Sequence, residues 1–254
     1  MLFHSVTRLE DTDLRSLIFV PTSMERSILL KTASDALEQV NVEVCGFGPI
    51  ASAARVSQVL SQSQYDHIIL TGIAGAYREH DLRVGNAYLF HQVTCHGIGV
   101  GEGKSHLSSD ELDWNQVEPS TGTGETGMIT AVKSHLELLV DDHLFRETRL
   151  DDHSKHLALL SCCSASANPT EAAERSMRYP HASAEDMEGF GVAVACHLHQ
   201  TPLCIVRGIS NEVGNRDHQQ WQVEQAMEAA AKLTMKLLAQ SERVPRGQSC
   251  ENEK

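Results

Sequence analysis

The strongest constraint on the fold of this chain is a regular alternation of short, β-rich apolar runs with longer segments of helical periodicity. The run 17–22, for example, is rich in Leu, Ile, Phe and Val, and apolar residues then recur at helical spacing over 23–39. Such an order of elements is typical of a three-layer α/β/α domain with a mostly parallel, twisted central sheet. The other expected strands are 42–45, 67–71, 87–93, 157–161 and 202–209, and the other expected helices are 50–61, 131–140, 170–177, a helix opened by 186–188, and 219–238.

The sequence contains no internal repeat and no linker, so a chain of 254 residues is expected to form a single domain over residues 17–240. Residues 1–16 carry acidic side chains and lack the apolar core of a signal peptide, and we expect a short N-terminal extension there. The polar residues 241–254 are expected to form a disordered C-terminal tail. Within the domain, the polar stretch 104–127 predicts an irregular loop.

Composition excludes several classes of protein. The net charge of −13 argues against a nucleic-acid surface, because phosphate contacts need clustered Lys and Arg. No apolar run reaches the roughly 18 residues that a transmembrane helix needs. The seven cysteines are odd in number, lack metal-ligand spacing and mostly lie in apolar runs, which predicts buried thiols in a reducing, cytoplasmic environment. The 14 histidines form no metal-binding motif either, and we expect no metal.

Two segments place chemically useful side chains near the ends of an expected helix and an expected strand. The first is Ala184-Glu-Asp-Met-Glu-Gly-Phe190, and the second, further along the chain, is Val206-Arg-Gly-Ile-Ser-Asn211. Together they supply carboxylates, a thioether, a guanidinium and a carboxamide. Because α/β proteins build small-molecule sites at the carboxyl ends of their strands, these segments predict such a site.

Both segments resemble the ribose- and base-binding signatures of the nucleoside phosphorylase/nucleosidase superfamily. Two further segments, Val20-Pro-Thr-Ser-Met-Glu25 and Gly72-Ile-Ala-Gly-Ala-Tyr77, resemble its water-positioning carboxylate and its glycine turn. The resemblance covers most of the chain, from residue 17 to residue 238. It implies a small-molecule nucleoside substrate, no cofactor, and a homo-oligomer (a dimer or larger), with neither nucleic acid nor membrane as a partner.

The resemblance implies that Glu25 positions and deprotonates the attacking water, with Arg207 nearby. It also implies that Met187 packs under the ribose and that Glu188 accepts hydrogen bonds from its two hydroxyls. A carboxylate suits this position because it accepts hydroxyl hydrogens and favours the positive charge that develops on the sugar. By position alone, Glu25 and Glu188 would only complement a helix dipole. The remaining residues that the resemblance implies as substrate-binding are Ala74, Gly75, Ala165, Ser166 and Asp186.

Three further expectations concern the surroundings of these residues. Gly72 and Gly75 predict a tight turn after the third strand, at a point where a Cβ would block close approach to a ligand. Ile73 stands where relatives carry a small hydroxyl residue, so a hydroxyl contact is not implied there. Arg207 lies on an expected buried strand and needs a charged partner, for which Glu25 or Glu188 is available.

Asn211, at the end of the second segment, is expected to select the base. Adenine-specific members of the superfamily carry an Asp here, which can protonate the ring and receive an exocyclic amine. A carboxamide better suits a 6-oxo group and its neighbouring ring N–H, which indicates hypoxanthine released by hydrolysis. Three alternatives remain open: an adenine-releasing nucleosidase, a phosphorylase that gathers Arg55, Arg78 and Arg207 around phosphate, and a nucleoside-binding module without catalysis.

Overall fold

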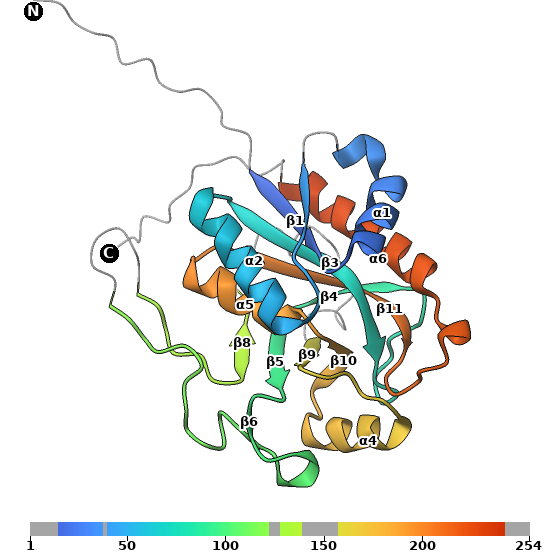
Figure 1. Cartoon of the computed structure of the whole chain (residues 1–254). Coiled ribbons are helices and arrows are strands. Elements are labelled where there is room, and N and C mark those ends of the chain that lie inside the picture. Colours follow the sequence, from blue (N-terminus) through green and yellow to red (C-terminus); the bar gives the residue numbers. More distant parts are fainter. Residues whose placement is uncertain (1–14, 38–39, 122–127, 139–156, 242–254) are drawn as a thin grey trace, which may run out of the picture.

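The computed structural model describes residues 15–37, 40–121, 128–138 and 157–241 of the chain. These ranges form a central sheet between two helical layers, which confirms the expected three-layer α/β/α fold (Figure 1). Two helices, α1 and α6, cover one face of the sheet, and α2 and α5 cover the other. The bounds of the helices are α1 Ser23–Thr32, α2 Gly48–Gln62, α4 Pro169–Arg178, α5 Gly189–Leu198 and α6 Val223–Ser241.

Within the described ranges, the sheet has nine strands in the order β2-β1-β3-β10-β9-β5-β8, with β11 and then β4 attached alongside β3. The pairs β1–β2, β1–β3, β3–β11, β9–β10 and β5–β9 are parallel, so the sheet is mostly parallel, as expected. A separate two-stranded ribbon joins β6 and β7. The bounds are β1 Ser16–Val20, β2 Asn41–Val44, β3 His67–Ala76, β4 Ala87–Phe90, β5 Gln92–His96, β6 Gly99–Val100, β7 Leu107–Ser108, β8 His135–Glu137, β9 Ala158–Cys162, β10 Ala182–Asp186 and β11 Leu203–Glu212.

Strand β1 illustrates how the apolar runs fill both helical layers. Leu17 and Phe19 belong to the apolar cluster under α2 and α5, whereas Ile18 and Val20 belong to the cluster under α1 and α6. Successive side chains of a strand point to opposite faces, so a strand buried on both sides needs a continuous apolar run. Each of these four side chains is fully buried, and such burial contributes about 1.5–3 kcal/mol per residue.

Strands β3 and β11 are longer than the sequence predicts, and together they carry much of the site. The expected tight turn at Gly72 and Gly75 is wrong, because β3 continues through both glycines and neither has the positive φ of a turn glycine. Gly72 instead pairs in register with Arg207 on β11, and Gly75 pairs with Asn211. The register shifts by one residue between Ile209 and Asn211, which marks a β-bulge.

The helix predicted over 131–140 is also wrong within the part of it that the structure describes. Residues 135–137 form β8, which pairs antiparallel with β5. The apolar residues Val132, Leu136 and Leu138 alternate with exposed or half-buried neighbours and pack against the α2/α5 cluster. Their period of two, rather than a helical period, reflects a strand on the sheet edge. Residues 139–140 lie outside the described ranges.

The helix expected to open at 186–188 begins three residues later. Asp186 ends β10, a strand that the sequence pattern did not predict, and α5 begins at Gly189 after Glu188 as its N-cap. The strand was missed because Ser183, Glu185 and Asp186 are polar, although all of them are buried. These polar side chains can be buried because neighbouring elements supply their hydrogen-bond partners. The segment therefore lacks the apolar pattern that normally marks a buried strand.

The remaining differences are smaller. The single strand expected over 87–93 is divided into β4 and β5, which pair with β11 and β9 respectively. A short 3-10 turn, His218–Gln220, precedes α6, where the sequence predicted helix from residue 219. The expected N-terminal extension 1–16, the tail 241–254 and part of the polar stretch 104–127 lie largely or partly outside the described ranges, so these boundaries stay predictions.

Candidate active site

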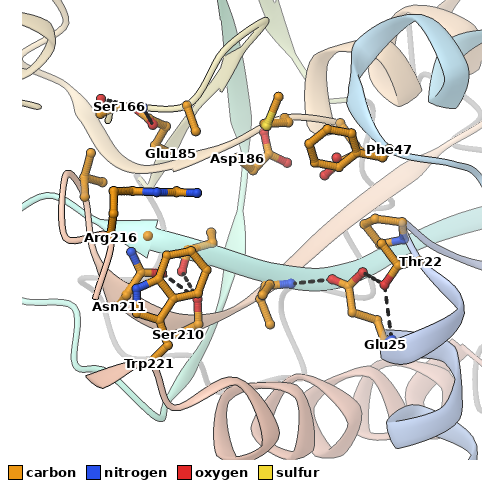
Figure 2. Close-up of a pocket in the computed structure, with 18 of the residues that line it drawn as sticks. Thr22, Glu25, Phe47, Ser166, Glu185, Asp186, Ser210, Asn211, Arg216 and Trp221 are labelled. Atoms are coloured by element: carbon orange, nitrogen blue, oxygen red, sulfur yellow. Dashed lines mark hydrogen bonds between the residues drawn. The ribbon is translucent and has the colours of Figure 1, made fainter. Parts of the chain in front are cut away.

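A pocket of about 260 Å³ opens where β1, β10 and β11 end and where β3 passes beside them (Figure 2). The structure brings the predicted site residues together here, and nine of the ten line the pocket. Arg207 is the exception, because its side chain is fully buried behind the pocket wall. The nine are Glu25, Ala74, Gly75, Ala165, Ser166, Asp186, Met187, Glu188 and Asn211.

Glu25 is held in a fixed position in the first turn of α1. Thr22 caps this helix: its hydroxyl accepts from the backbone N–H of Glu25 at 3.3 Å and donates to Oε2 of the same residue at 2.6 Å. The backbone N–H of Ile73 on β3 donates to Oε1 at 3.1 Å. The carboxylate is therefore buried, with 3% exposure, yet it retains acceptor capacity toward the pocket.

Arg207 is fully buried, and its main partner is Asp186. Nε and one terminal nitrogen donate to Oδ2 of Asp186 at 3.0 and 2.5 Å, whereas Oε2 of Glu188 lies 3.5 Å away. Of the two partners that the sequence offered, Glu188 does pair with Arg207, but as the secondary partner; the main partner, Asp186, was not expected in this role. Burial alone would lower the pKa of Arg207, but the charges of Asp186, Glu188 and Glu25 raise it, so the guanidinium stays charged.

The other terminal nitrogen of Arg207, Nη1, is buried and has no hydrogen-bond partner within the described part of the chain. A Cβ added to Gly72 would lie 2.3 Å from this nitrogen and 2.8 Å from Oε1 of Glu25. A cationic donor and an anionic acceptor thus converge on one glycine. Such a pair of groups can hold a water molecule between them, because one donates to its oxygen while the other accepts its proton.

Asp186 was predicted to bind substrate, but its carboxylate is already occupied by the protein. Oδ1 accepts from the hydroxyl of Ser161, and Oδ2 accepts from the backbone N–H of Gly189 at 2.9 Å as well as from Arg207. Its side chain is fully buried. This geometry favours a supporting role for Asp186, in which it neutralises and orients Arg207.

Glu188 lies at the N-termini of two helices, α5 and α2. Its Oε1 accepts from the backbone N–H of Gly48, the first residue of α2, at 3.0 Å. The side chain is 5% exposed, and burial raises its pKa to about 7, even though Arg207 acts in the opposite direction. Half-buried Met187 lines the pocket beside it, so a carboxylate and a thioether are both available at this end.

Asn211 lies just after the bulge in β11, across the pocket from Phe47 and Thr22 in Figure 2. Its Oδ1 accepts from the hydroxyl of Ser210 at 2.7 Å, and its Nδ2 donates to the carbonyl oxygen of Glu212 at 2.8 Å. These bonds fix the orientation of the carboxamide. One N–H and one oxygen lone pair remain for a ligand, because a carboxamide has two donor hydrogens and two acceptor positions.

Sequence reasoning missed a buried polar cluster centred on Glu185. This carboxylate accepts from the backbone N–H of Ser166 at 2.6 Å, from the Ser166 hydroxyl at 2.8 Å, from Tyr77 at 2.8 Å and from Arg175 at 3.1 Å. Burial and the Glu185 charge raise the pKa of Tyr77, so it remains a phenol donor. The cluster fixes the loop of Ala165 and Ser166 against the pocket. The only sequence signal was the position of Glu185 inside the first quoted segment.

Other residues that line the pocket lie outside the segments singled out in the sequence, among them Phe47, Arg216 and Trp221. Within the described ranges, no group of three or more His, Cys, Asp or Glu residues is arranged to hold a metal ion. No described helix is long and apolar enough to cross a membrane.

The fold and the pocket define an α/β protein with a small-molecule site at the carboxyl ends of its strands, containing buried carboxylates and a carboxamide. A family model described as the Phosphorylase superfamily matches residues 31–241, and the chain belongs to this superfamily. The superfamily expected from the sequence is thereby confirmed. The matched range begins after Glu25, so the position of Glu25 rests on the geometry described above.

Two curated relatives match about three quarters of the chain. A futalosine hydrolase from Streptomyces coelicolor is 26% identical over 197 residues, which cover 76% of this chain and 75% of that protein. A 5′-methylthioadenosine/S-adenosylhomocysteine nucleosidase from Bacillus subtilis is 23% identical over 197 residues, which cover 76% of this chain and 78% of that protein.

The fold is also shared with solved structures. A 5′-methylthioadenosine/S-adenosylhomocysteine nucleosidase from Colwellia psychrerythraea, crystallised with adenine, superposes with a TM-score of 0.67 at 17% identity. The match covers 90% of this chain and 96% of that one. At this identity the likeness concerns the fold.

Proposed function

We propose that this chain is a nucleoside hydrolase that cleaves the N-glycosidic bond of futalosine. The products are hypoxanthine and dehypoxanthine futalosine, and the reaction belongs to the alternative route to menaquinone. The observation that carries the proposal is the convergence of the Glu25 carboxylate and the unpartnered Arg207 Nη1 on Gly72, within the pocket that also contains Glu188 and Asn211. The proposal involves no cofactor.

In this mechanism Glu25 accepts a proton from a water molecule that Arg207 helps to orient. The water oxygen forms a bond to the anomeric carbon while the bond from that carbon to the base nitrogen breaks. The electron pair of the broken bond leaves with hypoxanthine, which hydrogen-bonds to Asn211 and takes up a proton from solvent. Ionised Glu188 accepts from the ribose hydroxyls and stabilises the positive charge that develops on the sugar.

The pairing of the arginines favours hydrolysis over phosphorolysis. Arg55 pairs with Glu43 at 2.6 Å, and Arg78 pairs with Glu212 at 2.7 Å; neither arginine lines the pocket. Arg207 already uses two of its nitrogens on Asp186. The described residues therefore offer no cluster of free guanidinium groups for a phosphate dianion, which needs several such donors.

Asn211 and the relative from S. coelicolor support hypoxanthine as the base. The free N–H of the carboxamide can donate to a 6-oxo group, and its free lone pair can accept from the neighbouring ring N–H. The second candidate is a 5′-methylthioadenosine/S-adenosylhomocysteine nucleosidase, the activity named for the B. subtilis relative. A carboxamide also matches the amino group and adjacent ring nitrogen of adenine, so both bases must be tested.

The deciding experiment incubates the purified protein with futalosine, inosine or methylthioadenosine, each with and without phosphate, and identifies the released base and sugar. Hypoxanthine from futalosine without phosphate supports the proposal. Preferential adenine release, or a requirement for phosphate, overturns it in favour of the second candidate or a phosphorylase. A chain that binds these nucleosides and releases no base would be the non-catalytic binding module.

The role of Glu25 is tested by Glu25→Gln, with Glu43→Gln as a matched control outside the pocket. Glu25→Gln is expected to abolish turnover while largely preserving substrate binding, because the carboxamide keeps the shape but does not accept the proton. Glu43→Gln loses only its pairing with Arg55 and is expected to retain turnover. Near-normal turnover by Glu25→Gln would exclude it as the base.

We also propose a cytoplasmic location and assembly into a homodimer or larger homo-oligomer. The six cysteines within the described ranges form no disulfide bond, which is compatible with a reducing compartment. Light scattering coupled to size-exclusion chromatography measures the assembly. A monomeric mass at micromolar concentration would contradict this part of the proposal.

A further inference from the structure

Two cysteine thiols lie in contact outside the candidate active site. Cys95 lies on β5, and Cys163 directly follows β9; the two strands pair side by side in the sheet (Figure 1). Cys95 is in register with Ser161, two residues before Cys163. Because side chains alternate between the faces of a sheet, Cys95 and Cys163 point to the same face, whereas Cys162 points to the other. The thiols of Cys95 and Cys163 are hydrogen-bonded to each other.

Cys163 can lie this close to β5 because the residue after β5 in the chain, beyond the strand's last residue, is a glycine. The backbone N–H of Cys163 donates to the carbonyl oxygen of His96 at 3.0 Å, so the strand pairing continues one residue past β9. A Cβ added to Gly97 would lie 3.0 Å from Cβ of Cys163 and 3.2 Å from its Sγ. The missing side chain of Gly97 therefore leaves the space in which the Cys163 thiol packs.

Cys163 has the properties of a reactive thiol. It is exposed, whereas the other five cysteines in the described ranges are buried. The hydrogen bond with Cys95 lowers the pKa of Cys163 to about 7, although partial burial acts in the opposite direction. The same bond, together with burial, raises the pKa of Cys95, so Cys95 stays protonated as the donor. Near neutral pH the pair is thus a nucleophilic thiolate beside a thiol, as in redox-sensing cysteine pairs.

We propose that Cys163 is a site of reversible oxidation by hydrogen peroxide and that Cys95 is its resolving cysteine. The Cys163 thiolate attacks one peroxide oxygen, the O–O bond breaks, and Cys163 becomes a sulfenic acid; the hydroxide that leaves takes up a proton from solvent. The Cys95 sulfur then attacks the Cys163 sulfur, the S–O bond breaks, and the hydroxyl leaves as water with the Cys95 proton. Two thiols are oxidised to a disulfide while one peroxide is reduced to two water molecules.

Oxidation at Cys163 affects the pocket because the segment that starts there reaches the pocket wall. Ala165 and Ser166 line the pocket, and Glu185 holds Ser166 in place. An S–S bond is about 2.05 Å long, so the two sulfurs must approach each other from hydrogen-bonding contact, and exposed Cys163 moves more easily than buried Cys95. Displacing the loop by about 1 Å is expected to lower kcat/KM on the order of 10- to 100-fold. The thiol chemistry itself is independent of which nucleoside the pocket accepts.

Mass spectrometry of the full chain tests the disulfide directly. The protein is treated with hydrogen peroxide, its remaining thiols are alkylated, and trypsin then releases Cys95 in peptide 84–104 and Cys163 in peptide 156–175. The two peptides are expected to be joined at Cys163 and to separate with dithiothreitol. Cys162→Ala is the matched control and should still form the link, whereas Cys163→Ser should not. A link that persists in Cys163→Ser, or no link in the parent protein, overturns the proposal.

Two substitutions of Cys95 separate the hydrogen bond from the disulfide, because serine keeps a donor and alanine does not. The rate of Cys163 alkylation by iodoacetamide should rise with pH around a midpoint of about 7 in the parent protein and in Cys95→Ser, and around the ordinary value of about 8.5 in Cys95→Ala. Equal midpoints in all three proteins overturn the assigned hydrogen bond.

The link to the pocket is tested by base release before and after peroxide treatment. The reduced variants should release base at the parent's rate, and peroxide should inhibit the parent and Cys162→Ala about 10- to 100-fold, reversibly with dithiothreitol, but not Cys95→Ser. Full activity of the cross-linked parent, or an equal loss in Cys95→Ser, overturns the role of the disulfide.

Discussion

Adding one methyl group at Gly72 tests whether Glu25 and Arg207 enclose the reacting centre. In Gly72→Ala the new Cβ would lie 2.3 Å from Nη1 of Arg207, 2.8 Å from Oε1 of Glu25 and 3.0 Å from Cδ of Pro21. An ordinary van der Waals contact begins at 3.4 Å, so the guanidinium must retreat by about 1 Å, and it starts from a fully buried position.

The expected cost follows from this displacement. Misplacing a catalytic group by about 1 Å reduces turnover on the order of 100-fold, which corresponds to about 2.7 kcal/mol of transition-state stabilisation. The methyl also occupies the space between the two groups, where the attacking water would bind. Overpacking a dense interior costs about 1–3 kcal/mol of folding stability as well, so activity and stability must be measured together.

Gly208→Ala is the matched control, because Gly208 follows Arg207 on β11. Its Cβ would meet the backbone carbonyl of Ala226 on α6 at 2.0 Å, on the sheet face opposite to the one toward which the neighbouring Arg207 side chain points. Thermal unfolding and steady-state base release should therefore separate the variants. Gly72→Ala should lose about 100-fold in kcat/KM while still folded, whereas Gly208→Ala should lose stability but keep turnover below its unfolding temperature. Near-normal turnover by Gly72→Ala would refute the reasoning that Glu25 and Arg207 act at this point.

The other predictions concern the ionisation of Glu188, the Arg207–Asp186 ion pair and the polar cluster around Glu185. In the proposed mechanism the ionised form of Glu188 binds the ribose, so kcat/KM is expected to rise with pH up to about 7 and then level, and Glu188→Gln should remove this dependence. Between the ordinary pKa of 4.5 and the raised value of about 7, Glu188 is more protonated in the folded state than in the unfolded state. The urea midpoint of unfolding should therefore fall as pH rises through that window. A rise would contradict burial as the cause of the raised pKa. Asp186→Asn should destabilise the chain by about 3–5 kcal/mol by leaving Arg207 uncompensated, and adding Arg207→Met should recover part of this in thermal unfolding; strictly additive losses would contradict the pairing. Tyr77→Phe removes a hydrogen bond to Glu185 and so loosens the loop of Ala165 and Ser166, which should raise KM without changing kcat. An unchanged KM would show that this cluster does not support the site.

The parts of the fold that sequence predicted best are those whose local pattern agrees with their environment. The β1 run is apolar throughout because both faces are covered, and the first helix follows it with Thr22 as a cap. Glu25 could be placed at the rim of the sheet for the same reason: it follows a strand directly. Because α/β proteins build their sites at the carboxyl ends of the strands, Glu25 was expected near the segments around Glu188 and Asn211. All three residues do line the same pocket.

The parts that sequence could not predict depend on contacts between distant segments. Strand β10 contains the buried carboxylates Glu185 and Asp186, and their donors come from Ser161, Arg175 and Arg207, far away in the chain. A single sequence presents such residues as polar and therefore exposed, because their partners are invisible to periodicity. The choice of Asp186 over Glu25 as the partner of Arg207 has the same origin.

The β-bulge between Ile209 and Asn211 divides β11 into two parts that can diverge independently. Before the bulge, Arg207 is in register with Gly72 and paired with the buried carboxylate of Asp186, so substitution there disturbs the interior. Beyond it, the backbone is offset by one residue from β3, and Asn211 is fixed mainly by its own chain neighbours. Under the proposed function, changes after the bulge can therefore alter recognition of the base while the groups proposed to break the bond stay unchanged, which makes this strand a place where new substrate selectivities can evolve.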